Sequence, residues 1–230
     1  PLFLLSLALD RVLWGLSPAG HHLQSLAWHL LACVALGKLL RQLVPLVPAL
    51  LGLALFALHP VQVEAVAWVS ARNDPMSGAL LLGALVVFLP ASVSRRSCIL
   101  GGVLFLAALL SKESVVLGPV FLLFLDLARW RRPGGSERFI AMGLALVAWG
   151  LLRAWAGVGA AVLPDSEDLR LLTTSMPELV GLYGSLLVWP LPLSTGRFLP
   201  YLTLSLEGLI LGWSVLVVAG LLLWRRGGAL

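Results

Sequence analysis

The chain has 230 residues, of which 60% are hydrophobic and 12% charged, and its mean hydropathy is +0.99. Soluble domains carry about a quarter charged residues and under half apolar ones, so the composition excludes an ordinary soluble domain and indicates an integral membrane protein. The net charge of +5 gives no reason to expect nucleic-acid binding, because Lys and Arg in membrane proteins mark the cytoplasmic side.

A series of apolar runs follows along the chain, separated by breaks that carry Gly, Pro or charge, as turns do. The runs cover residues 23–42, 45–58, 76–91, 98–110, 114–128, 139–156, 176–191 and 208–224. Several approach the roughly 20 residues that cross a bilayer. No repeat or low-complexity linker divides the sequence. This predicts one all-α domain over residues 1–230, a polytopic transmembrane helical bundle of about seven spans with short interfacial helices on its outer face.

Basic residues gather after alternate apolar runs, which gives the bundle an orientation. The residues placed inside are Lys38, Arg41, Arg95, Arg96, Arg129, Arg131, Arg132, Arg138, Arg225 and Arg226. Every acidic residue except Asp126 and Glu137 then falls on the outer half. The positive-inside rule predicts this asymmetry.

Two segments test the orientation. Residues 98–128, as one straight helix at about 1.5 Å per residue, would overshoot a hydrocarbon core of roughly 30 Å and would place Arg129 outside. We therefore expect two arms that meet on the outer side at residues 111–113. A span over 176–191 would move Arg225 outside, so this segment is predicted to be part of an outer-face or re-entrant helix that Pro190 and Pro192 break.

The outer segment HPVQVEAVAWVSARND, residues 59–74, is unusually polar for its place between two apolar runs. If residues 60–72 form a helix, Glu64, Trp68 and Arg72 recur every four residues and share one face. Valine and alanine residues supply the opposite face. The pattern predicts a short helix at the membrane interface, with its polar stripe facing a water-filled cavity.

Cysteine and histidine indicate packing rather than metal chemistry. Cys33 and Cys98 are far apart and form no CxxC motif, which predicts neither a disulfide nor a zinc site. His22 and His29 share one helical face, but two histidines without a carboxylate make a poor metal site, so hydrogen-bonded packing is expected. Asp10 lies in a stretch expected to form an outer interfacial helix.

Blocks of sequence in a specific order carry a family resemblance. The blocks are PLFLLSLALDRVLWGLSPAGHHLQSLAWH, HPVQVEAVAWVSARNDPMSG, LLSKESVVLGPVFLLFLDL and LYGSLLVWPLPLS. The last three look like a His-Pro…Glu-Ala-Val-x-Trp…Arg-x-Asp block, a Leu-Ser-Lys-Glu block and a Tyr…Pro-x-x-Leu-Ser block. In this order they resemble the C superfamily of glycosyltransferases, and more closely the transmembrane O-mannosyltransferases that carry tetratricopeptide repeats and their bacterial relatives.

The resemblance implies transfer of a sugar such as mannose from a polyprenyl-phosphate carrier to an acceptor at the outer face. The acceptor would be a glycan or a protein Ser or Thr. The family also has a first membrane helix, an acidic catalytic motif in the first outer loop, and repeats. This chain lacks all three, and Ser25 stands where the family often has Asn. The chain is therefore expected to be a piece of a longer enzyme, with its own activity left open and no catalytic residue assigned.

Candidate site residues follow from this chemistry, which needs cations to stabilise the phosphate leaving group and a carboxylate to activate the acceptor hydroxyl. Arginine suits phosphate because it offers a permanently charged, planar fork of donors. The candidate donor-phosphate ligands are Arg72, Lys112 and Arg153. The candidates that support them or orient a divalent metal are His59, Glu64, Asp74 and Glu113.

Each candidate also has a purely structural interpretation. His59 would cap the following helix, Glu64 would pair with Arg72, and Lys112 would pair with its neighbour Glu113. Asp74 precedes Pro75, which is the pattern of an N-cap followed by a first-turn proline. Arg153 would extend to the interface as long basic side chains do near helix ends.

The expected partners are membrane lipid, the polyprenyl-phosphate-linked sugar and an acceptor protein or glycan, with no nucleic acid. A divalent metal is left open as a cofactor. The expected location is a multi-pass position in a bacterial inner membrane or the endoplasmic reticulum membrane. A transporter or flippase for a lipid-linked substrate is the first alternative, although such proteins often contain inverted repeats. A non-catalytic membrane scaffold is the second.

Overall fold

The computed structural model describes residues 1–90, 92–129, 135–158, 180–181, 183–184 and 186. The chain divides into two compact units, Pro1–Gly159 and Ala160–Leu230, and the first contains nearly all of the described residues. The predicted span 208–224 and the basic residues Arg131, Arg132, Arg225 and Arg226 lie outside the described residues, as does most of 176–191. The assignment of residues 1–230 to one domain stays a prediction.

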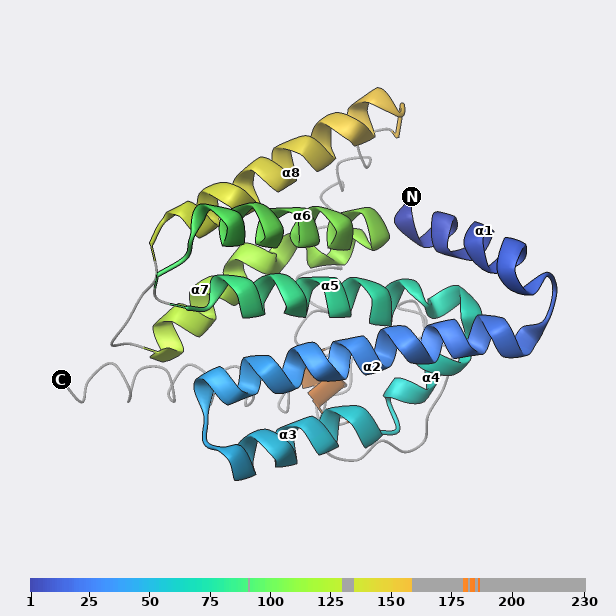
Figure 1. The fold of residues 1–230 in the computed structure, drawn as a ribbon, viewed down its shortest axis with the longest axis horizontal. Helices are drawn as coiled ribbons and strands as arrows, with labels where there is room; N and C mark the ends of the chain where they lie inside the picture. The colour runs from blue at the N-terminus through green and yellow to red at the C-terminus, as the bar shows by residue number, and fades with distance from the viewer. Residues whose placement is uncertain (91, 130–134, 159–179, 182, 185, 187–230) are drawn as a thin grey trace. The chain divides into compact units, whose positions relative to one another are not determined.

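Every regular element in the described part of the chain is a helix, so the all-α prediction is confirmed. The main helices are α2 (Pro18–Leu43), α3 (Leu46–Leu58), α5 (Asn73–Phe88), α6 (Arg95–Ser111), α7 (Gly118–Arg129) and α8 (Glu137–Trp155). In Figure 1, α2, α5 and α7 run in one direction and α3, α6 and α8 run back. The loops of the first unit are therefore gathered at two opposite ends.

Short elements occupy the end at which α2, α5 and α7 begin. They are α1 (Leu2–Trp14), α4 (Gln62–Ala67), η1 (Val69–Ala71) and η2 (Glu113–Leu117). The predicted break of residues 98–128 into two arms is confirmed, since α6 stops at Ser111 and the chain turns back through η2 into α7. At the opposite end lie Lys38 and Arg41 near the end of α2, and Arg95 and Arg96 at the start of α6 (Figure 1).

The predicted continuous helix over residues 60–72 is wrong. The α-helix covers only Gln62–Ala67, Trp68 is extended at φ −90° and ψ 109°, and a 3-10 turn follows. The interruption breaks the four-residue spacing, so Glu64 and Trp68 are exposed whereas Arg72 is buried. Tertiary contacts of Arg72, described below, override the local helical pattern here.

The apolar core lies between α5, α6, α7 and α8. Its largest fully buried apolar side chains are Phe88, Phe105, Leu89, Leu109, Leu122 and Met142. Two glycines allow this close packing. A Cβ on Gly101 would lie 2.5 Å from the Phe88 ring, and a Cβ on Gly118 would lie 2.5 Å from the Phe105 ring.

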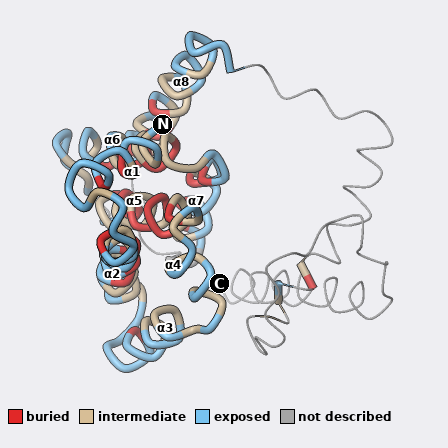
Figure 2. The backbone as a smooth tube through the Cα atoms, turned by 90° about the vertical axis from the view of Figure 1, so that its right-hand side faces the viewer, coloured by how far each residue is buried: buried red, intermediate tan, exposed pale blue. Residues whose placement is uncertain are grey.

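The surface of the first unit carries many large apolar side chains, unlike the surface of a soluble protein. Large apolar side chains such as Leu31, Leu51, Leu144 and Leu151 are more than half exposed, and Figure 2 shows exposed residues, in pale blue, along α2, α3 and α8. Soluble monomers rarely expose large apolar patches. Among the described helices, α2 and α8 are long and apolar enough to cross a membrane, and α3 is a shorter apolar helix. These features indicate association with a membrane.

Candidate functional site

Polar residues from separate elements meet at the end of the unit where α2 and α5 begin. Asp10 comes from α1, and Arg72 immediately precedes α5. His21 and Ser25 come from α2, where their spacing of four places both on one helix face. We call Asp10, His21, Ser25 and Arg72 the Arg72 cluster.

Arg72 lies at the centre of this cluster, and its side chain is 0% exposed. Its Nη1 lies 2.5 Å from Asp10 Oδ2, its Nη2 donates to the His21 carbonyl oxygen over 2.8 Å, and its Nε donates to Ser25 Oγ over 3.1 Å. Every guanidinium nitrogen therefore has an oxygen neighbour. The planar fork of arginine joins α1, α2 and the start of α5, which the single ammonium of lysine would not do.

Asp10 is equally buried, and charge holds it in place. Its Oδ2 lies 2.5 Å from Arg72 Nη1 and 2.9 Å from His21 Nδ1, but neither contact has the angles of a hydrogen bond. Its Oδ1 accepts no hydrogen bond from any described residue. A buried carboxylate destabilises the fold unless it is paired with a cation, so Arg72 is what allows Asp10 to be buried in this position.

A second ion pair lies between the start of α5 and the end of α6. Lys112 Nζ contacts Asp74 Oδ1, and the two side chains remain 33% and 44% exposed, respectively. The predicted N-cap role of Asp74 is wrong, because α5 begins at Asn73 and the N-cap position falls on Arg72. The predicted Lys112–Glu113 pair is also wrong, since Lys112 contacts Asp74 and Glu113 is exposed.

The remaining predicted residues are dispersed. Glu64 is exposed and does not join Arg72 in any described contact. His59 uses Nδ1 to accept a hydrogen bond from the Val61 N–H over 3.2 Å, in keeping with its structural interpretation. Arg153 lies near the end of α8 with its guanidinium 5.0 Å from the centre of the Trp149 ring, a cation–π contact on the same helix.

Sequence reasoning missed Asp10, His21 and Ser25 as partners of Arg72. An acidic residue inside the apolar run LLSLALD was the available signal, because such a residue needs a buried cation. The histidine interpretation was correct for His29, whose ring stacks on Phe56 and whose Nε2 lies 3.3 Å from the Ala57 carbonyl oxygen.

Metal binding receives no support from the described part of the chain, where no three His, Cys, Asp or Glu residues are grouped to hold an ion. The Arg72 cluster supplies one carboxylate and one imidazole, and both already face Arg72 or each other. A permanent cation occupies the position that a metal would need. The cluster is therefore better suited to orienting side chains than to binding a divalent ion.

A buried arginine at the opposite end of the unit resembles Arg72 in its surroundings. Arg138 at the start of α8 donates two bonds to Asp126 of α7, over 2.6 and 3.1 Å, and one to the Phe88 carbonyl oxygen over 2.9 Å. Its side chain is 0% exposed. This pair connects α5, α7 and α8 and has no solvent-facing donor, so it is a structural element rather than a ligand site.

Comparisons with protein-family models, curated proteins and solved structures found no match to this chain.

Proposed function

We propose that the chain is the membrane core of a glycosyltransferase that moves a sugar such as mannose from a polyprenyl-phosphate carrier to a glycan or protein acceptor. The reaction would take place at the end of the unit that contains the Arg72 cluster and the Asp74–Lys112 pair. One observation carries the proposal, namely that Asp10, Arg72, Asp74 and Lys112 gather at one end of a largely apolar unit. Ionisable groups in a membrane protein are costly and often mark functional sites.

The proposed topology takes α2, α3 and α5–α8 as spans and residues 208–224 as the last one, which gives about seven. The alternating helix directions and the basic residues at the opposite end support this arrangement (Figure 1). Helices α3 and α7 are short, at 13 and 12 residues, but with η2 the segment 113–129 extends over about 25 Å, and a short apolar helix such as α3 is accommodated by local thinning of the bilayer. The Arg72 end would then face the periplasm or the lumen of the endoplasmic reticulum.

Within this proposal, Lys112 and Arg72 have different roles. Lys112 is partly exposed and has a single carboxylate partner, so an incoming phosphate could exchange with Asp74. Arg72 is fully buried with its nitrogens already engaged, so it would position α1 and α2 rather than touch the donor. The carboxylate of Asp74, once released, would lie beside the bound phosphate as a hydrogen-bond acceptor for the approaching hydroxyl.

Donor binding by purified protein in lipid nanodiscs tests the proposal. With a radiolabelled polyprenyl-phosphate mannose as probe, we expect Lys112→Gln to weaken binding about 10- to 100-fold, the scale of a lost hydrogen bond between charged groups. Asp74→Asn should instead strengthen binding, because it frees Lys112 and removes a repelling charge. Arg96→Gln, an exposed position at the opposite end that lines neither groove described below, is the matched control and should leave binding unchanged.

Lys112→Gln and Asp74→Asn are expected to change donor affinity in opposite directions, and this difference separates a role in donor binding from a purely structural role. If the pair only holds α5 against α6, both substitutions will lower thermal stability and neither will change donor affinity. Absence of donor binding by the wild type would contradict the proposal directly. Donor binding followed by movement of the lipid across a sealed liposome, without transfer to any acceptor, would favour the transporter instead.

A further inference from the structure

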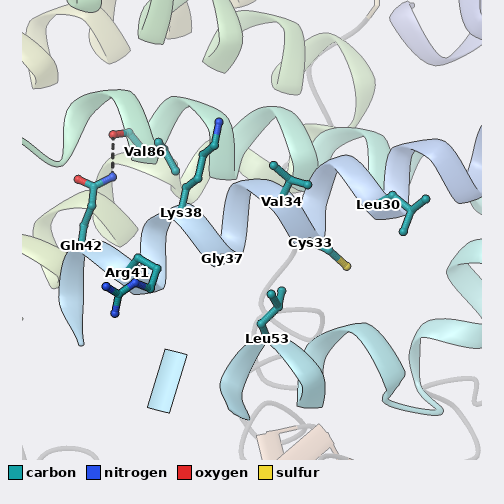
Figure 3. A pocket seen from close by; sticks show the side chains of 9 residues that line it. All are labelled: Leu30, Cys33, Val34, Gly37, Lys38, Arg41, Gln42, Leu53 and Val86. Atoms are coloured by element: carbon teal, nitrogen blue, oxygen red, sulfur yellow. Dashed lines mark hydrogen bonds between the residues drawn. The ribbon is translucent and has the colours of Figure 1, made fainter. Parts of the chain in front are cut away.

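A groove on α2 lies at the end of the unit opposite the Arg72 cluster. It has a volume of about 800 Å³ and is lined by residues of α2, α3 and α5, which is within the size range of small-ligand sites. Its apolar wall consists of Leu30, Cys33, Val34, Leu53 and Val86. Figure 3 shows Leu53 of α3 pointing towards α2 across this wall.

The polar end of the groove is positively charged. Lys38 and Arg41 line it, and in Figure 3 their side chains leave α2 in different directions, so that the polar end carries two separate cations. Both residues are exposed, and no described acidic residue forms an ion pair with either. Gln42 beside them donates to the Val86 carbonyl oxygen over 3.3 Å, which joins α2 to α5 at this end.

A second groove shows that this charge is not a general property of the surface. It lies between α6 and α8, and its end contains Arg95 together with Glu137, so its formal charge is neutral. Apolar residues line the rest of it, as in the first groove. The two grooves therefore differ mainly in the charge at the polar end, and only the α2 groove complements an anion.

We infer that the α2 groove binds one anionic phospholipid, with an acyl chain along the apolar wall and the headgroup at the polar end, where Lys38 and Arg41 attract its negative charge. Basic pockets between helices at the cytoplasmic side of a membrane recognise such headgroups. The inference rests on the membrane embedding proposed above and not on sugar transfer. The bound lipid would fill the space beside α3 and hold α3 against α2 and α5.

Native mass spectrometry of the purified chain with phosphatidylglycerol and phosphatidylcholine tests the site. We expect the wild type to retain phosphatidylglycerol selectively. The double variant Lys38→Gln, Arg41→Gln should weaken that binding about 10- to 30-fold, because each basic side chain near an anionic headgroup contributes a factor of about five. Arg95→Gln, Arg96→Gln is the matched control, which removes equal charge from the same end outside the groove and should have little effect.

The apolar wall provides an independent arm that does not change charge. Val34→Trp should fill the groove and reduce phosphatidylglycerol binding, whereas Leu31→Trp, on an exposed part of α2 outside the groove, should not. The site would be overturned if the Lys38, Arg41 and the Arg95, Arg96 double variants lost phosphatidylglycerol binding equally, or if Val34→Trp lost none. Either result would mean that the lipid is held by general attraction to the charged surface. Displacement of phosphatidylglycerol by a polyprenyl phosphate at equal concentration would overturn the choice of ligand. If the wild type binds phosphatidylglycerol but no sugar donor, the proposed function fails and this inference still holds.

Discussion

At the scale of single residues, the fully buried Arg72 side chain matters most, because it joins α1, α2 and the start of α5. Arg72→Ala would leave the Asp10 carboxylate buried without its cation, and breaking a buried pair costs about 3–5 kcal/mol. We therefore expect a large fall in the midpoint of thermal unfolding in detergent. Arg153→Ala, which removes a partly exposed arginine in a cation–π contact, should cost under about 1 kcal/mol.

A double variant separates the cost of an unpaired charge from the loss of packing. Arg72→Met combined with Asp10→Leu should recover much of the stability that Arg72→Ala loses, because apolar residues of similar volume often replace a buried ion pair without penalty. If the double variant is less stable than Arg72→Ala alone, the contacts with Ser25 and the His21 carbonyl oxygen contribute more than the pair itself.

At the scale of elements, neighbouring glycines of α6 make a matched test of helix packing. Gly101→Ala would place a methyl group 2.5 Å from the buried Phe88 ring, so we expect destabilisation of about 1–3 kcal/mol from overpacking. Gly102→Ala would meet Ala141 at the ordinary distance of 3.5 Å and should be neutral or stabilising, since alanine favours a helix. Thermal unfolding of both variants would measure the difference, and equal effects would contradict the close approach of α5 and α6.

Helix positions were predictable from the sequence, and their interactions were not. The runs 23–42, 45–58 and 98–110 correspond to α2, α3 and α6, because apolar segments between charged or proline-containing breaks are a local property. The error at residues 60–72 arose where tertiary contacts decided the backbone. Arg72 binds groups from α1 and α2 that lie far from it in sequence, so no local pattern could show that the helix stops before it.

At the scale of the whole molecule, the proposed membrane topology depends on the two chemically different ends of the first unit. Buried and partly buried ion pairs with Arg72 and Lys112 lie at one end, and exposed Lys38, Arg41, Arg95 and Arg96 lie at the other. Charge asymmetry along the sequence predicted that these four basic residues lie on one side of the membrane, and the structure places them at one end of the first unit. The pairing of Asp10 with Arg72 could not be predicted in this way, because it exists only once α1 has packed against α2 and brought Asp10 to the residue before α5.

Cysteine accessibility in sealed right-side-out membrane vesicles tests the central claim most directly. In a chain with Cys33 and Cys98 replaced by Ala, Ser70→Cys and Ser92→Cys place single thiols on exposed positions at opposite ends of the first unit. A membrane-impermeant maleimide should label residue 70 in intact vesicles and should label residue 92 only after the vesicles are opened. Labelling of both positions in intact vesicles, or of residue 92 alone, would contradict a membrane core with the Arg72 end outside.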